Sequence, residues 1–331
     1  MRTMLTQSLA VLMPFNVQEL NDSGGNYYGI NQISKNINVG NRKRLINGNG
    51  FVFGVPGSGK SFFCKMEMGS VFLSGNDEII VIDPMNEYFD IAQTYGGTVV
   101  NMSTYTDNYV NPLAMDVWNL DQNDTKGWVR EKGEFMLGLC EQCIGESLNS
   151  RQKSIIDRCV AQVCKEQKQT GIPATLCTVR EKLMEQPEPA AMDIALTMEL
   201  YTSGSLDIFA HETNVDTKNR IISYDIHDLG EELKQPGFVT ITDAMLNRVN
   251  YNWARGKKTH VIVDEFHIAY ENEYSGNFFT SAWRQFRKRN AYPVAITQNV
   301  DYLLEAPQAR SMLSNSEFIV MLNQAENDQE R

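Results

Sequence analysis

The stretch GVPGSGKSFF, residues 54–63, fits the pattern G-x-x-x-x-G-K-[ST] of a phosphate-binding loop. A strand-like apolar run, FVF at residues 51–53, precedes it, and a helix-like segment that stops near Gly75 follows it. Glycines let backbone N–H groups turn inward around phosphates, and the positive end of the following helix faces the same point. The stretch therefore predicts a nucleotide site in a strand–loop–helix unit at the start of an α/β sheet.

Separate roles are expected for the positions of this loop. Lys60 is expected to contact the β- and γ-phosphates, and the Ser61 hydroxyl to bind Mg²⁺. The predicted cofactors are ATP and Mg²⁺. The residues predicted to contact the nucleotide are Gly54, Pro56, Gly57, Ser58, Gly59, Lys60, Ser61 and Phe62.

The motif HVIVDEFH, residues 260–267, supplies the acids that such a loop needs at the end of a neighbouring strand. Asp264 is predicted to be the magnesium ligand and Glu265 the general base that activates water. Gln298, which ends the strand-like run YPVAIT, is predicted to sense or orient the γ-phosphate. For Asp264 and Glu265 the alternative is a solvated strand end, and for Gln298 an ordinary strand-end side chain.

Two further segments leave alternatives open. WRQFRKRN at residues 283–290 offers Arg284, Arg287 and Arg289 as arginine fingers for a neighbouring subunit, or as a solvated basic face. In VIDPMNEY, Asp83 lies beside the nucleotide or caps a helix.

Periodicity divides the chain into three parts. Residues 1–119 and 207–331 carry the strand-like runs and form two halves of one ATPase core, whereas residues 120–206 repeat apolar positions at helical spacing and predict an all-helical insertion. NRKRLINGNGFVFG, residues 41–54, predicts a hairpin that turns at residues 47–50.

Composition narrows the function classes. With 331 residues, 42% of them apolar and 21% charged, the chain has the composition of an ordinary soluble globular protein. A net charge of −11 argues against a protein that coats DNA, because such binding requires Lys and Arg on phosphates. The six cysteines are predicted to be buried thiols, since they form no disulfide or zinc pattern.

The order of these motifs resembles the conjugative ATPases of type IV secretion systems, the VirB-four or TraC/TraE-like class of the HerA/FtsK-like motors. The resemblance spans almost the whole chain. It is carried by GVPGSGKS, VIDPMNEY, VNPLA, YTSGSLDIFAHETNVD, VIVDEFH, FRKRN, ITQNV and NSEFIVMLNQ.

This resemblance implies a RecA-like core with a mainly parallel sheet flanked by helices, a helical insertion and ATP hydrolysis. The same resemblance implies homo-oligomeric assembly, as a hexamer in the full machine or at lower order, down to a monomer, for a fragment. It also implies docking with other secretion subunits and the coupling protein at the cytoplasmic face of the membrane. The chain would then be the C-terminal ATPase domain of a longer protein. The resemblance makes Lys60, Glu265, Arg287 and Gln298 the catalytic residues, and it departs at Asn290 and Ala291, where a Gly pair is expected.

Two rivals remain open on the sequence. A DNA-translocating coupling protein or HerA/FtsK-like DNA pump would need basic loops, of which the sequence offers only residues 42–44 and 284–289. A scaffold that binds nucleotide but turns it over slowly is the non-enzymatic alternative.

Overall fold

The computed structural model describes residues 18–114, 125–271, 273–298 and 300–324. Its centre is a sheet of seven strands in the order β5-β6-β4-β7-β8-β3-β9, and each pair of neighbours is parallel. The strands are β3(Gly50–Phe53), β4(Glu78–Asp83), β5(Thr98–Asn101), β6(Ile221–Asp225), β7(Thr259–Val263), β8(Ala291–Thr297) and β9(Phe318–Met321). The predicted mainly parallel α/β core is confirmed.

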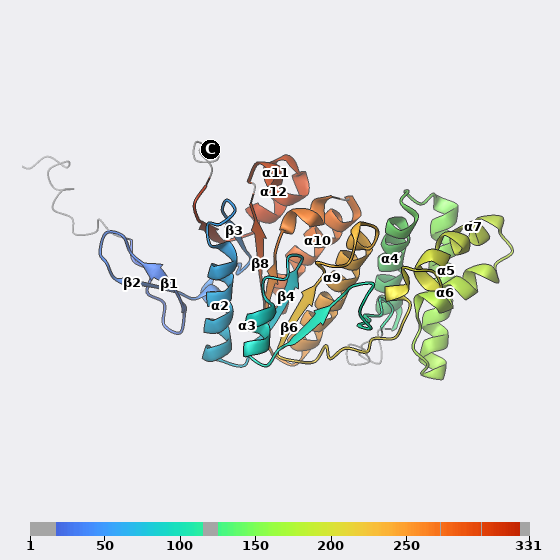
Figure 1. The fold of residues 1–331 in the computed structure, drawn as a ribbon, viewed down its shortest axis with the longest axis horizontal. Coiled ribbons are helices and arrows are strands. Elements are labelled where there is room, and N and C mark those ends of the chain that lie inside the picture. The colour runs from blue at the N-terminus through green and yellow to red at the C-terminus, as the bar shows by residue number, and fades with distance from the viewer. Residues whose placement is uncertain (1–17, 115–124, 272, 299, 325–331) are drawn as a thin grey trace, which may run out of the picture.

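Helices cover both faces of this sheet (Figure 1). Successive side chains of a strand point to opposite faces, so Val52 of β3 packs in one core and Phe51 and Phe53 in the other. α2(Lys60–Ser74) and α3(Phe89–Thr94) cover the first face, and α9(Glu231–Ala254) and α10(Glu273–Phe286) cover the second. Because both faces are buried, the strands are apolar throughout, as the run EIIVID of β4 shows.

Five helices follow one another between β5 and β6: α4(Thr125–Ile144), α5(Ser150–Thr170), α6(Leu176–Met184), α7(Pro189–Thr197) and α8(Glu199–Thr202). They gather at one end of the molecule (Figure 1). An ion pair of 2.5 Å between Lys132 of α4 and Asp243 of α9 ties them to the core. The proposed division at residues 119/120 and 206/207 stays a prediction, and its first boundary lies outside the described residues.

A small antiparallel hairpin of β1(Asn26–Ile30) and β2(Ile37–Gly40) lies at the other end of the molecule (Figure 1). The hairpin predicted at residues 47–50 is wrong: residues 41–49 contain the 3₁₀ turn η1(Arg42–Arg44) and no strand. β3 instead pairs with β8 on one side and β9 on the other. These tertiary partners take the backbone groups that a local hairpin would have used.

The remaining elements complete the carboxyl-terminal half: η2(Asp207–Phe209), η3(Phe266–Tyr270), η4(Arg287–Arg289), α11(Val300–Glu305) and α12(Pro307–Ser314). All six cysteines are free; four are buried, whereas Cys143 and Cys177 are half-buried. In the described part of the chain, no helix is both long enough and apolar enough to cross a membrane.

Candidate nucleotide-binding site

The predicted phosphate loop joins the carboxyl end of β3 to the first turn of α2. Gly57 and Gly59 have φ angles of 75° and 93°, which favour glycine. The first hydrogen bond of the helix runs from the Phe63 amide to the Gly59 carbonyl, so the amides of the preceding turn have no partner within α2. These free donors and the positive helix end favour an anion at this point, and the predicted nucleotide contacts stay a prediction.

Two side chains of the loop fit a bound phosphate. The Lys60 ammonium donates to the carbonyls of Gly54 and Val55, at 2.9 and 3.2 Å, and is thereby held against the loop. The Ser58 hydroxyl oxygen is buried without a hydrogen-bond partner. Because an orphaned buried hydroxyl costs free energy, a ligand oxygen at this point would be favourable.

The edge strand β9 contacts the phosphate loop on the side of β3 opposite to β8. The Val55 amide donates to the Asn323 carbonyl at 2.9 Å, and a Cβ placed on Gly54 would lie 3.1 Å from the Cβ of Leu322. The segment NSEFIVMLNQ thus has a structural role as the neighbour of β3 and its loop.

Asp264 and Glu265 follow β7, whose carboxyl end lies at the same edge of the sheet as that of β3. Their strand is not adjacent to the loop strand in the sheet, because β8 pairs with both and lies between them. Two strand spacings correspond to about 10 Å, a gap that a magnesium–triphosphate group can bridge. Gln298 follows the intervening β8 and so lies between the two motifs.

Charges of the two motifs act on each other. The pKa of Glu265 is lowered mainly by His267, and Lys60 adds to this effect. The pKa of Cys64, one turn after Ser61 in α2, is raised mainly by burial, with Glu67 and Asp264 adding to the rise. Burial raises the pKa of Asp264 itself to about 7, and the nearby Glu265, Glu87 and Asp83 add to the rise. A carboxylate in such surroundings is a favourable place for a cation.

A magnesium ion at this site would be bound by both protein side chains and nucleotide phosphates. In the described residues no group of three or more His, Cys, Asp or Glu side chains is placed to hold a metal ion. The ion would therefore rely on the Ser61 hydroxyl, the Asp264 carboxylate and the phosphates of the nucleotide, which suits the preference of Mg²⁺ for few protein ligands.

Glu265 is held by two side chains. Gln298 donates its amide N–H to Oε1 of Glu265, and Nδ1 of His267 lies 3.2 Å from Oε2. The hydrogen bond with His267 lowers the pKa of Glu265, against the effect of its burial. His267 stands two residues after Glu265 in the motif VDEFH, but nothing in its sequence spacing indicated a role.

The arginine candidates lie at the opposite edge of the sheet, because η4 precedes β8. Arg289 donates to the Asn250 side chain and Arg284 donates to Ser311, whereas Arg287 is exposed and has no hydrogen bond or ion pair with the described residues. Seven residues of β8 span about 20 Å, so Arg287 cannot reach the loop of its own chain. Asn290 takes the left-handed conformation, φ 50°, that the expected glycine would take.

Asp83 caps the turn after β4. Its carboxylate accepts hydrogen bonds from the amides of Glu87 and Tyr88, at 2.9 and 2.8 Å, just before α3. These contacts match the capping alternative. Phe62, in contrast, is 74% exposed in the first turn of α2 and available to a nucleotide.

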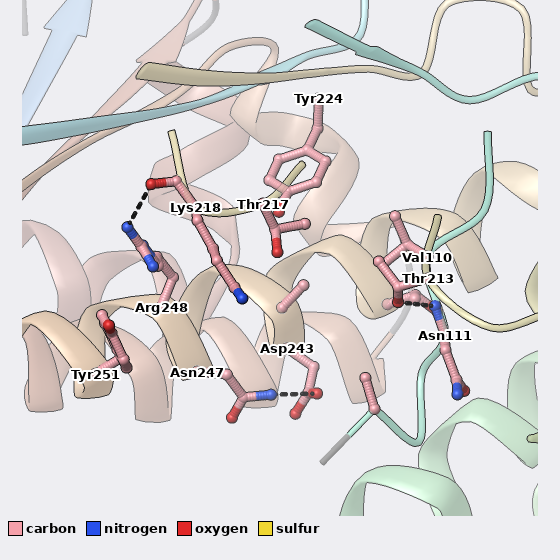
Figure 2. Close-up of a pocket in the computed structure, with 13 residues that line it drawn as sticks. Val110, Asn111, Thr213, Thr217, Lys218, Tyr224, Asp243, Asn247, Arg248 and Tyr251 are labelled. Carbon is pink, nitrogen blue, oxygen red and sulfur yellow. Dashed lines mark hydrogen bonds between the residues drawn. The ribbon is translucent and has the colours of Figure 1, made fainter. Parts of the chain in front are cut away.

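A separate cavity of about 110 Å³ lies beside α9. Figure 2 shows the side chains that line it. Its walls come from α9, the segment before β6 and the segment after β5, and include Asp243, Arg248 and Lys218. None of the predicted nucleotide-binding residues lines it, so this cavity is not the nucleotide site.

The sequence profile described as "Helicase HerA, central domain" matches residues 35–250, more than half of the chain. The chain belongs to this HerA family. The match covers the loop, the helical insertion and most of α9, which agrees with the predicted membership of the HerA/FtsK-like group. A comparison with curated protein sequences gives no significant match.

Solved structures share the fold of this HerA-family chain. "VirB4 of Thermoanaerobacter pseudethanolicus" superposes with a TM-score of 0.79 at 22% identity, over 95% of this chain and 88% of that one. The plasmid coupling protein TrwB with ADP and Mg²⁺ gives a TM-score of 0.53 at 14% identity, over 85% and 71%. TrwB with a non-hydrolysable ATP analogue gives 0.55 at 14% identity, over 99% and 79%. The predicted RecA-like P-loop NTPase fold is confirmed.

Proposed function

We propose that this HerA-family chain is a magnesium-dependent ATPase that powers a conjugative type IV secretion system, either in assembling the channel or pilus or in moving DNA or protein substrate through it. The fold shared with VirB4 and TrwB supports the class of machine, and the complexes of TrwB with ADP, Mg²⁺ and an ATP analogue support the cofactors.

One observation carries the enzymatic part of the proposal. A lysine-bearing phosphate loop, an acid pair and a glutamine end three adjacent strands of the sheet at one edge. In hydrolysis a bond forms between the water oxygen and the γ-phosphorus while the bond to the bridging oxygen of ADP breaks. Lys60 stabilises the charge on the phosphates, and Glu265 accepts the proton of the attacking water.

The proposed assembly follows from the position of Arg287. Since η4 lies at the opposite end of β8, a strand about 20 Å long, from the loop edge, Arg287 acts on the site of a neighbouring copy. We therefore propose a ring of identical chains, a hexamer in the full machine, with nucleotide at the subunit interface. Contact with other secretion subunits and the coupling protein would hold the ring at the cytoplasmic face of the membrane.

Phosphate release by wild type, Lys60→Ala and Glu265→Gln tests the proposal. Turnover should fall by at least about 100-fold in both variants, and nucleotide affinity should fall only in Lys60→Ala. Lys153→Ala and Glu166→Gln, which change exposed residues of the insertion, are matched controls. Undiminished turnover in Lys60→Ala or Glu265→Gln defeats the assignment, and ATP binding without turnover by wild type at every protein concentration would support the scaffold.

The second candidate is a DNA pump, and the HerA helicase profile is the observation that favours it. DNA binding measured over a salt series separates the two candidates. A steep loss of affinity with rising salt indicates phosphate contacts and supports the pump. Absence of binding at low salt, with intact ATP turnover, supports the secretion motor.

A further inference from the structure

The proposed general base has a strained backbone. Glu265 has a φ angle of 44°, in the left-handed region that a non-glycine residue enters only at an energetic cost. Its amide donates to the Asp264 carboxylate at 2.8 Å, and the residue caps the 3₁₀ turn η3. Such a conformation persists only where neighbouring groups hold it, so the contacts of its side chain bear on its role.

These contacts involve both carboxylate oxygens, Oε1 through a hydrogen bond and Oε2 through the close approach of an imidazole nitrogen. Gln298, at the end of β8, holds Oε1, and Nδ1 of His267 lies 3.2 Å from Oε2. The two donors come from different elements, and together with Glu265 they line one cavity of about 320 Å³ at the carboxyl edge of the sheet. A carboxylate that is contacted on two sides has little freedom of rotation. Its orientation, and so the direction from which it can accept a proton, is then fixed.

The two donors differ in position. Gln298 follows the strand that lies between the acid strand and the loop strand, so it is on the side of the phosphate loop. His267 lies two residues after Glu265 in η3, and its side chain is 42% exposed, against 14% for Glu265. His267 therefore lies on the solvent side of the carboxylate and approaches Oε2, a buried oxygen that accepts no hydrogen bond of good geometry from the described residues.

We propose that His267 is a positioning residue that holds the Glu265 carboxylate in the orientation needed to accept a proton from water. The inference rests on the proposed function of Glu265. Without His267, only Gln298 contacts the Glu265 carboxylate, which can then rotate. Rotation slows the chemical step but does not weaken nucleotide binding.

Three substitutions of His267 in the full 331-residue chain test this role. Asn places an amide nitrogen near the position of Nδ1, whereas Gln places it near that of Nε2. We expect His267→Asn to keep at least half of the wild-type kcat, and His267→Gln and His267→Ala to lose about 10-fold. KM for ATP and affinity for ADP should stay within about twofold in all three. His211→Ala is the matched control, because it removes a similar histidine–carboxylate pair, with Asp207, far from the loop.

Each outcome has a definite consequence. A kcat of His267→Gln within twofold of wild type overturns the inference, and so does an equal loss in His267→Asn and His267→Gln. A loss of ADP affinity as large as the loss of kcat also overturns it, since that would indicate a binding role. Wild type and Glu265→Gln are measured in the same assay: if wild type is inactive, or Glu265→Gln is fully active, the proposed function itself fails.

Discussion

Buried carboxylates occur at both ends of the central strands, but their partners differ. At the amino end of β4, Glu78 is 2% exposed and accepts hydrogen bonds from Arg248, Asn252 and Lys257. At the carboxyl ends, Asp83 and Asp264 are equally buried, yet neither forms an ion pair with a described residue. Burial raises the pKa of both.

The difference distinguishes Glu78, an acid with a structural role, from Asp264, the proposed magnesium ligand. When Lys or Arg side chains of the same chain contact a buried carboxylate, they neutralise its charge in the folded state. Such a carboxylate favours the packing arrangement that brings these side chains together. A buried carboxylate that has none destabilises the folded chain until a cation arrives from outside. The amino edge thus holds the sheet together, while Asp264 at the carboxyl edge is available to magnesium.

Asp264→Asn should give the largest effect and the clearest contrast. Turnover should fall by at least about 100-fold because the magnesium ligand is lost. The melting temperature without nucleotide should stay the same or rise, since the raised pKa means that the charged carboxylate destabilises the folded state near neutral pH. Phosphate release and thermal melting check this, with the exposed Asp193→Asn as control. A large drop in melting temperature would place Asp264 with the structural acids.

Glu78→Gln should show the reverse pattern. Arg248, whose side chain is 11% exposed, would lose its carboxylate, so the free energy of unfolding should fall by about 3 kcal/mol. Turnover per folded molecule should stay within about twofold of wild type. Urea unfolding followed by circular dichroism measures the first quantity. A Glu78→Gln variant with wild-type stability and reduced turnover would contradict the structural role of Glu78.

Asp77 provides a pH-dependent test at the amino edge. Burial acts to raise its pKa, but hydrogen bonds from His260 and Lys43 outweigh this and lower it to about 2. Its folded pKa is below the unfolded value of 3.8, so its contribution, about 2 kcal/mol, is present above pH 4 and lost as the pH falls toward 2. Asp77→Asn should therefore be less stable than wild type at pH 5, and the gap should narrow by pH 3. A gap that stays constant contradicts this account.

The exposed pair of Arg130 and Glu134 on α4 should give the smallest effect. The two side chains are 81% and 67% exposed, so solvent screens their attraction. Arg130→Ala should leave both the melting temperature and the turnover unchanged within error. A measurable loss of stability would mean that this face of α4 is covered in an assembly.

Local patterns were sufficient for the elements with strong signals. The run EIIVID becomes β4, the segment after Lys60 becomes α2 and ends at Gly75, and the acid pair ends β7. The hairpin at residues 47–50 was predicted wrongly because its Asn-Gly turn is only a local preference, which the pairing of β3 on both sides overrides. The sequence did not indicate a role for His267, because a single histidine carries no spacing pattern.

The sequence by itself determined the phosphate loop, the acid pair and the parallel α/β class, since each depends on residues that are neighbours along the chain. Only the tertiary structure decided that β8 lies between the loop and the acids, that His267 and Gln298 contact Glu265, and that Arg287 lies at the opposite end of the strands from the loop. The physical reason is that strand order and side-chain contacts arise from burial and hydrogen bonding between segments far apart in the chain. Local periodicity does not contain that information.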